Sequence, residues 1–326
     1  MQFANPLGST DNTIRIEPTK GAHALCPVCR QEVIARCGTT RRWHWAHQKN
    51  CQCSDHWWEN ETDWHRHWKE EFPENWREVL LQDEATGEIH RADVKLKNSG
   101  LVLEIQHSSI DTQELQSRVN FYQNMVWIVD ARPSWFKRFM KRLIGVEGHF
   151  AVIPNDKAKL DPRVKDVLQR VAVADFELYG VHYLEDIFPK AWLGSSVPVI
   201  FDFASEQEAS LESDYVTVTQ LKGCYLASGS SEVISENSHK GITKRLWCLL
   251  PDEFGRPRCV CAFRRKDFVS ALLSNGYWIR PQTPQEEEIC RKKQVEEIHE
   301  WECRKNAAER RQRQLMQNLI WGRVGR

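Results

Sequence analysis

The sequence predicts an α/β fold, with a small metal-binding module before the core and a long charged helix after it. Three observations lead to this prediction. Residues 1–53 are rich in cysteine and histidine without a helical period, whereas residues 54–132 show the pattern order helix, three strands, helix, strand. Residues 283–326 form one highly charged stretch of helical character. Between these parts, residues 133–282 are predicted to be a mixed α/β region.

The composition is that of an ordinary globular protein. Of 326 residues, 41% are hydrophobic and 28% charged, enough for two domains or for one domain with additions. Lysine plus arginine and aspartate plus glutamate balance at 45 each, so nucleic-acid binding would have to come from local basic patches. The first residues lack the features of a signal peptide, and no apolar run approaches the roughly 18 residues of a membrane span. We therefore expect a cytoplasmic protein with no membrane contact.

The first module carries a zinc-binding pattern. Cys26 and Cys29 form C-x2-C, and His44 and His47 form H-x2-H, 15 residues further on. In a reducing compartment, clustered cysteines are more often metal ligands than disulfides. Two short-spaced pairs can close a tetrahedral site, which predicts a structural Zn²⁺. The nearby cysteines remain alternative ligands: Cys37, Cys51 and Cys53.

The tip between the two pairs, Thr40-Arg41-Arg42-Trp43, is basic and aromatic. It suits a phosphate contact through Arg41 and Arg42, and the alternative is a solvated turn. Seven tryptophans fall within residues 43–76. Most of these rings are expected to build a compact core, although some could stack on bases.

The first helix of the core is predicted from a cap at Ser54 or Asp55 to about Glu71, where Phe72-Pro73 ends it. The helix carries acidic, imidazole and ammonium groups at spacings of four residues, which places them on one face: Glu61, His65 and Lys69. The simpler interpretation of this face is an exposed row with a Glu–Lys pairing. Neighbouring tryptophans instead favour a half-buried functional face.

Three strands are expected to follow, with turns at Ala85-Thr86-Gly87 and Asn98-Ser99-Gly100. A helix capped near Asp111 should run to about Tyr122. The apolar run over 126–129 is typical of a buried parallel strand.

A divalent-cation site is predicted on two of these strands. Asp93 and Glu104 flank the turn at residues 98–100, so the hairpin would bring their carboxylates side by side. Like charges at close range force one group to protonate unless a cation lies between them. Oxygen donors with room for water suit Mg²⁺ or Mn²⁺.

These motifs together closely resemble the competence protein CoiA-like family. They are CPVC…WHWAH, Glu61-x3-His65-x3-Lys69, RADV…LEIQHS, R-x3-Y and WIVDA. The resemblance covers roughly residues 20–132 and continues weakly through KAWLGSSVPVIFDF and LWCLLP. Members look like PD-(D/E)XK-superfamily nucleases with an N-terminal zinc-binding module. The resemblance implies a restriction-endonuclease-like αβββαβ core and Mg²⁺-dependent cleavage of DNA phosphodiester bonds.

The resemblance also implies roles for individual residues. It carries the metal ligands to Asp93 and Glu104, with Glu61 as a helper. The last motif position, often Lys, is Gln106, which is expected to orient the attacking water by hydrogen bonding. Lys69 or His65 is then expected to contact the phosphate or the transition state. The following helix would supply nucleic-acid contacts on one face through Arg118 and Tyr122.

Several alternatives stay open at this point. DNA cleavage could serve competence and recombination or defence against phage DNA. Because Gln106 replaces a charged residue, the chain could instead be a weak or inactive DNA-binding module that acts in a complex. The C-terminal helix shows no clean heptad, and Arg304–Arg326 holds seven Lys/Arg against one Glu, a net +6. It is therefore interpreted either as an arm for self-assembly or a protein partner, or as a DNA-binding arm.

Overall fold

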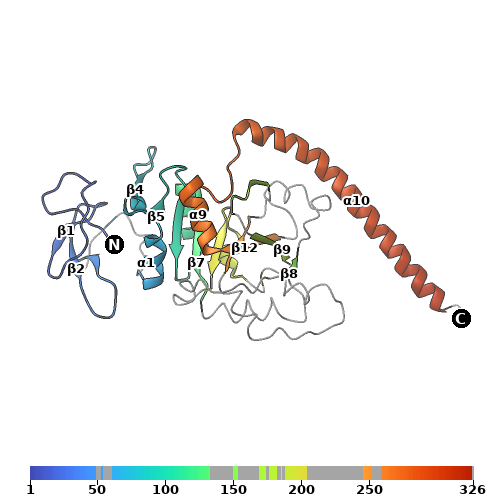
Figure 1. Cartoon of the computed structure of the whole chain (residues 1–326), viewed down its shortest axis with the longest axis horizontal. Helices are drawn as coiled ribbons and strands as arrows, with labels where there is room; N and C mark the ends of the chain where they lie inside the picture. Colours follow the sequence, from blue (N-terminus) through green and yellow to red (C-terminus); the bar gives the residue numbers. More distant parts are fainter. Residues whose placement is uncertain are drawn as a thin grey trace.

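The computed structural model describes residues 1–48, 53, 61–132, 150–152, 169–173, 176–181, 185, 188–203, 245–251 and 258–324. It shows a small sheet at one end of the molecule and a larger sheet covered by helices in the middle (Figure 1). The long charged helix predicted at the end of the sequence is α10 (Pro284–Val324). It extends away from the body of the molecule (Figure 1). Its apolar side chains Ile289, Val295 and Leu315 are exposed. Within the described ranges, no helix combines the length and apolar character needed to cross a bilayer.

The N-terminal module is a three-stranded antiparallel sheet in the described part of the chain. Its strands are β1 (His23–Leu25), β2 (Glu32–Arg36) and β3 (His44–His47). Trp45 is buried in a small core with Val33, Ala24 and Ala4. The first residues run alongside this sheet, since Asn5 forms a bridge with Leu25.

The described strands of the larger sheet have the order β4-β5-β6-β7-β10-β11-β12-β9-β8. Its first part contains α1 (Asp63–Glu70), the 3-10 turn η1 (Glu74–Trp76), β4 (Arg77–Gln82), β5 (Ile89–Lys95), β6 (Val102–Gln106), α2 (Thr112–Tyr122) and β7 (Met125–Asp130). This sequence of elements matches the predicted order helix, three strands, helix, strand. Strand β7 lies parallel to β6, as its apolar run predicts.

The sheet continues into the later part of the chain. The additional elements are β8 (Phe150–Val152), β9 (Phe176–Val181), α5 (Lys190–Leu193), β10 (Val199–Asp202), β11 (Arg245–Leu249), β12 (Arg258–Arg264) and α9 (Arg265–Asn275). Strand β10 pairs parallel with β7, and β11 and β12 follow antiparallel. The strands on both sides of residue 132 therefore share one sheet. The basic segment after residue 132 and the polar stretch 206–243 lie outside the described residues.

Capping side chains fix where the helices begin. The Thr62 hydroxyl accepts a hydrogen bond from the backbone N–H of His65, so α1 begins at Asp63 and not at the predicted Ser54 or Asp55. Those two residues lie outside the described part of the chain. Asp111 caps α2 as predicted, because its carboxylate accepts from the N–H groups of Gln113 and Glu114.

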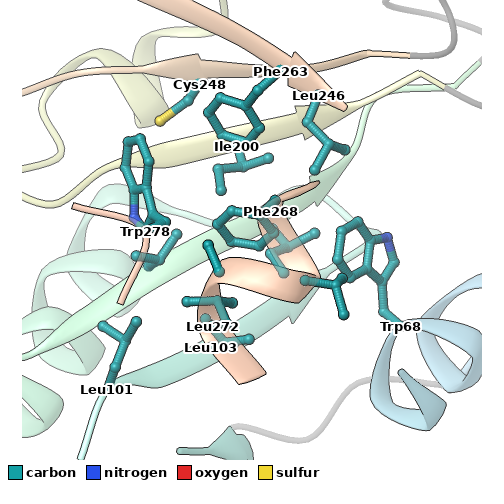
Figure 2. Packing of buried hydrophobic residues seen from close by; sticks show 14 of the residues in the cluster. Trp68, Leu101, Leu103, Ile200, Leu246, Cys248, Phe263, Phe268, Leu272 and Trp278 are labelled. Atoms are coloured by element: carbon teal, nitrogen blue, oxygen red, sulfur yellow. The ribbon is translucent and has the colours of Figure 1, made fainter. Parts of the chain in front are cut away.

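Helices cover both faces of the sheet. On one face, α1 and α9 pack over a buried cluster in which the Phe268 ring lies between the indoles of Trp68 and Trp278, at centroid distances of 6.4 and 6.2 Å (Figure 2). On the other face, α2 and α5 pack over a second cluster that includes Leu115 and Trp127. The cores therefore hold α1 and α2 on opposite sides of the strands that carry Asp93 and Glu104.

A buried carboxylate locks α1 onto the sheet. Asp202, at the end of β10, is 1% exposed, and its Oδ2 accepts hydrogen bonds from the indole Nε1 of Trp64 and of Trp68, both at 2.9 Å. The guanidinium of Arg265 lies 3.8 Å from the same oxygen. The two tryptophans are four residues apart on α1, so one carboxylate fixes both turns of the helix.

We predict that Asp202→Ala lowers the free energy of unfolding by about 3 kcal/mol, because two buried indole N–H groups lose their acceptor. Asp202→Asn keeps one acceptor oxygen, so its free energy of unfolding should lie between those of Asp202→Ala and the parent protein. Urea denaturation measures the change. The matched control is Glu71→Ala, which removes an exposed partner of the same Arg265 (3.2 Å) and should cost less than about 1 kcal/mol. Equal losses in the two alanine variants would contradict the anchoring role.

Candidate functional site

Side chains from α1, β4, β5, β6 and α2 meet in a cavity of about 30 Å³. Since a cavity of about 10–15 Å³ already holds one water, this space fits an ion with a water but no nucleotide. The charged and polar residues that line it are Glu61, His65, Lys69, Glu78, Arg91, Asp93, Glu104, Gln106 and Arg118. The cavity therefore brings together the residues predicted for catalysis.

The strand register brings Asp93 and Glu104 together. Val94 pairs with Leu103, which places Asp93 opposite Glu104 on the neighbouring strand. The Glu104 Oε1 accepts from the backbone N–H of Asp93 at 3.2 Å, and the Asp93 Oδ2 accepts from that of Ile105 at 2.9 Å. Each carboxylate thus bonds to the other strand, and the pair is held rigidly.

A break in the side-chain alternation of β5 accompanies this arrangement. Ala92 packs in the cluster on one face of the sheet and Val94 in the cluster on the other, although residues two apart on a regular strand share a face. The partner position on β4 is Glu78, whose φ of +49° is unusual for a non-glycine residue. The irregularity aims both Asp93 and Glu78 into the cavity.

The pKa values of the two carboxyl groups are shifted in opposite directions. Burial, and then the nearby charge of Asp93, raise the pKa of Glu104 to about 8, although the Arg118 Nη1 lies 3.0 Å from its Oε2. Burial would also raise the pKa of Asp93, but the imidazole of His65, 2.9 Å away, together with Lys69 and the backbone N–H of Ile105 outweighs burial and brings the value to about 2. Near neutral pH a proton on Glu104 relieves the repulsion between the two groups, and a bound cation would take over that role.

Two residues of the predicted face, His65 and Lys69, lie on α1 and point into the cavity, and Glu61, which precedes the helix, joins them there. His65 contacts Asp93, and the Lys69 ammonium forms ion pairs with Glu61 and, at 2.8 Å, with Glu78. Burial would lower the pKa of Lys69, but the charges of Glu61 and Glu78 outweigh it and raise the pKa, so the ammonium stays protonated. The simpler interpretation of an exposed row is excluded, because His65 and Lys69 are buried.

Glu78 and Arg91 were not predicted from the sequence. The Glu78 carboxylate is buried, and the Arg91 Nε lies 4.0 Å from its Oε2. Burial would raise the pKa of Glu78, but Lys69 and Arg91 hold it well below its ordinary value. The signal in the sequence is weak: an acidic residue directly before the apolar run Val79-Leu80-Leu81.

The remaining predicted residues lie in or behind the cavity wall. Gln106 lines the cavity, and its Nε2 donates to the hydroxyl of Ser108 at 3.3 Å. Arg118 is buried and forms ion pairs with Glu104 and Glu114. Tyr122, the last residue of α2, is buried in the core under this helix. Because this face of α2 packs on the sheet, the structure places Arg118 and Tyr122 in the interior and not on a surface that duplex DNA could reach.

The N-terminal module contains a second candidate metal site. One ligand atom each from Cys26, Cys29, His47 and Cys53 lie within 4.8 Å of one another. Three sulfurs and one nitrogen form a common donor set for structural zinc, and a tetrahedron with bonds of about 2.3 Å separates its sulfurs by about 3.8 Å. The residues therefore fit a metal such as Zn²⁺.

The cluster contains Cys53 where the sequence predicted His44. The H-x2-H pair was expected to lie on a tight turn, but it forms strand β3, in which residues three apart point to opposite faces. The His44 Nδ1 instead contacts the backbone carbonyl of Arg42 at 2.8 Å. Of the alternative cysteines, Cys37 lies outside the cluster and Cys51 outside the described residues.

We predict that Cys53→Ser protein loses its zinc, whereas His44→Ala protein keeps it, since only Cys53 lies within the donor cluster. Elemental analysis of the purified full chain measures the ratio of zinc to protein. Cys37→Ser is the matched control, a free cysteine outside the cluster. Zinc loss in His44→Ala together with retention in Cys53→Ser would restore the original ligand assignment.

The basic tip of the module lies against α1. The Arg42 Nε contacts the Asp63 carboxylate at 2.6 Å, so this side chain already bridges the module and the helix. Arg41 is exposed, and the Trp43 ring is 48% exposed. All four residues of the predicted phosphate-contact tip are exposed, and Arg42 is the one already paired with a carboxylate of α1.

Comparison with known proteins supports part of this picture. Residues 12–56 match the family model described as "Competence protein CoiA, N-terminal domain". The match supports the resemblance to the CoiA-like family over these residues. It spans the Cys/His cluster but not the cavity around Asp93 and Glu104. None of the curated proteins and none of the solved structures matched the chain significantly.

Proposed function

We propose that this protein is a divalent-metal-dependent nuclease that hydrolyses DNA phosphodiester bonds at the cavity around Asp93 and Glu104. The observation that carries the proposal is the pair of carboxylates held face to face on β5 and β6, with Lys69 and Gln106 in the same cavity. The competence-related family match favours DNA as the substrate and a role in processing incoming DNA. Defence against phage DNA would use the same chemistry.

The cavity residues fit a hard divalent cation. Asp93 and Glu104 offer carboxylate oxygens, the donors that Mg²⁺ and Mn²⁺ prefer, and the volume of about 30 Å³ leaves room for water. A cation between the two groups would also offset the burial and the repulsion by Asp93 that together raise the pKa of Glu104 to about 8. When bound, such an ion stabilises negative charge on the phosphate and increases the acidity of water.

The chain's own residues would position the substrate and the attacking water. The Lys69 ammonium is buried and is held protonated by Glu61 and Glu78, so it would supply positive charge to the cavity without direct contact with the substrate. The Gln106 side chain can orient water by hydrogen bonding but supplies no charge. Lys69 therefore takes over the electrostatic part that a lysine at position 106 would supply. His65, in contact with Asp93, is placed to exchange a proton at the edge of the cavity.

The second candidate function is a DNA-binding module that does not cleave. It is favoured by the ion pair between Arg118 and Glu104, which already neutralises one predicted metal ligand, and by the uncharged Gln106. In this interpretation the cavity charges stabilise the fold. Such a module would bind DNA and leave it intact with every divalent ion.

A metal-dependence assay separates the two functions. Purified full-length protein is incubated with single-stranded, duplex and branched DNA in Mg²⁺, Mn²⁺, Ca²⁺ or EDTA. The nuclease proposal expects cleavage of at least one substrate with Mg²⁺ or Mn²⁺ and none with EDTA. DNA binding without cleavage in all the ions would support the second function.

A further inference from the structure

We infer that Glu78 couples the Cys/His metal cluster to the cation site at Asp93 and Glu104, so that loading of the cluster positions the catalytic cavity. The inference rests on the proposed function, because it assigns regulation to the cavity proposed as the nuclease site. It makes Glu78 a positioning residue that acts through Lys69. The structural basis is a continuous set of contacts from the cluster to the cavity.

The first step of this path is the Glu78 carboxylate. Its Oε1 and Oε2 accept the backbone N–H of Gln2 at 2.8 and 3.0 Å, and Oε2 also accepts that of Phe3 at 3.1 Å. On its other side, Oε1 accepts from the Lys69 ammonium at 2.8 Å. A single buried carboxylate therefore joins the first residues of the chain to the ammonium group of the cavity.

The second step links these residues to the cluster. Asn5 and Leu25 exchange backbone hydrogen bonds of 2.9 and 2.8 Å, and Leu25 is followed directly by the ligand Cys26. The backbone N–H of Trp45 donates to the carbonyl of Met1 at 2.9 Å, and Trp45 lies two residues before the ligand His47. Strand β1, which ends directly before Cys26, and β3, which carries His47, thus hold the residues on either side of Gln2 and Phe3, the two that reach Glu78.

The third step is energetic. The module's three described strands have three to five residues each and share a small buried cluster, so its core alone supplies little stability. A structural metal contributes folding free energy to such modules. Without it, the strands would release residues 2 and 3, and the buried Glu78 would lose the N–H groups that satisfy its oxygens. Lys69, which shares this carboxylate, would then lose its fixed position beside Asp93.

The irregular backbone at Glu78 supports a functional role. A positive φ at a non-glycine residue costs free energy and persists where surrounding contacts enforce it. A merely structural glutamate could lie on a regular strand. Here the distortion points the carboxylate to the junction between module and cavity.

The test is a double-mutant cycle on the full chain, with Mn²⁺ affinity measured by calorimetry. The cycle combines Cys53→Ser, which removes a cluster ligand outside the strands, with Glu78→Gln, which removes the ion pair to Lys69. Each single variant should weaken Mn²⁺ binding at least about tenfold, the usual size of such outer-shell effects. The double variant should bind no more weakly than the single variants, because both act through one path.

Two matched controls should leave the Mn²⁺ affinity unchanged. Cys37→Ser alters a cysteine outside the cluster. Glu74→Gln alters the exposed partner of Arg15 (3.9 Å), which joins the same two parts of the chain away from the cavity. The coupling would be overturned if the losses of Mn²⁺ affinity in the two single variants multiplied in the double variant. Full Mn²⁺ affinity in Cys53→Ser would also overturn it.

Hydrogen exchange gives a readout that needs no metal in the cavity. In the parent protein, Cys53→Ser should speed hydrogen exchange at the amides of α1 around Lys69. In the Glu78→Gln protein, adding Cys53→Ser should cause no further increase. Unchanged protection of α1 in Cys53→Ser would contradict the coupling even where Mn²⁺ binds. Absence of Mn²⁺ binding to the parent protein would instead contradict the proposed function, and the exchange data would still decide the coupling.

Discussion

The Asp93→Asn and Glu104→Gln proteins are expected to lose DNA cleavage by roughly 10³-fold, because a catalytic metal supplies several kcal/mol to the transition state. Both substitutions keep the size of the side chain, and each amide oxygen can still accept the backbone hydrogen bond from the neighbouring strand. The fold should therefore be retained. Cleavage rates under single-turnover conditions with Mn²⁺ measure the effect.

The Glu104→Gln protein loses cleavage, but its free energy of unfolding should not fall. The folded-state pKa of Glu104 is raised from 4.5 to about 8, so its stabilising contribution is present below pH 4.5 and is lost as the pH rises to about 8. Glu104→Gln removes this pH dependence and should be as stable as the parent or more stable at pH 8. Glu114→Gln is the control, since it removes the half-buried second partner of the same Arg118 and should still cleave. Full cleavage in both Asp93→Asn and Glu104→Gln would show that neither carboxylate is part of the catalytic site.

The Lys69→Met protein is expected to be less stable by about 3–5 kcal/mol near neutral pH, because Glu61 and Glu78 become buried charges without their shared partner. Cleavage should be lost as well, since the cavity loses its ammonium group. Urea denaturation measures the free energy of unfolding. Lys97→Met, at an exposed lysine in the turn between β5 and β6, is the control and should change it by less than about 1 kcal/mol.

The pH dependence of this variant distinguishes lost ion pairs from lost packing. In the parent, burial would raise the pKa of Glu61, but Lys69 together with Arg66 and His65 outweighs it and brings the value from 4.5 to about 2. The stabilisation by this pair is therefore present above pH 4.5 and is lost as the pH falls toward 2. In Lys69→Met the carboxyl groups of Glu61 and Glu78 can protonate well above pH 2. The difference in free energy of unfolding between the variant and the parent should therefore become smaller between pH 7 and pH 4. A gap that stays constant would show that packing alone is responsible.

The parts of the fold that the sequence predicts are those set by local patterns. The apolar period and the carboxylate before it place α2 after Asp111, and the Asn98-Ser99-Gly100 turn sets the hairpin that brings Asp93 opposite Glu104. His65 and Lys69 share a face of α1 through helix geometry, whereas Glu61, predicted on the same helix, lies before its start at Asp63. Because these features depend on neighbours within a few residues, reasoning from the sequence recovers them.

The parts that were missed depend on distant residues. Glu78 enters the cavity through a backbone distortion and through amide groups more than 70 residues away, at Gln2 and Phe3. Asp202 meets the indoles of α1 from a strand more than 130 residues later. Arg118 was predicted to face nucleic acid, but the packing of α2 turns it toward Glu104. The local sequence contains no signal for such meetings.

The choice between Cys53 and His44 was missed for a different reason. The spacing of His44 and His47 was compatible with a turn, and the strand that forms instead separates the two rings to opposite faces. The strand depends on pairing with β2, in the register Arg36↔His44 and Val33↔His47. Spacing patterns of metal ligands therefore need a secondary structure before they identify ligands.

Anomalous diffraction from crystals of the full chain grown with Mn²⁺ would locate both metals. We expect a manganese peak in the cavity, within bonding distance of one oxygen each from Asp93 and Glu104, and a separate zinc peak among Cys26, Cys29, His47 and Cys53. A cavity without manganese at saturating concentration, with the Arg118–Glu104 ion pair intact, would contradict the proposed cation site.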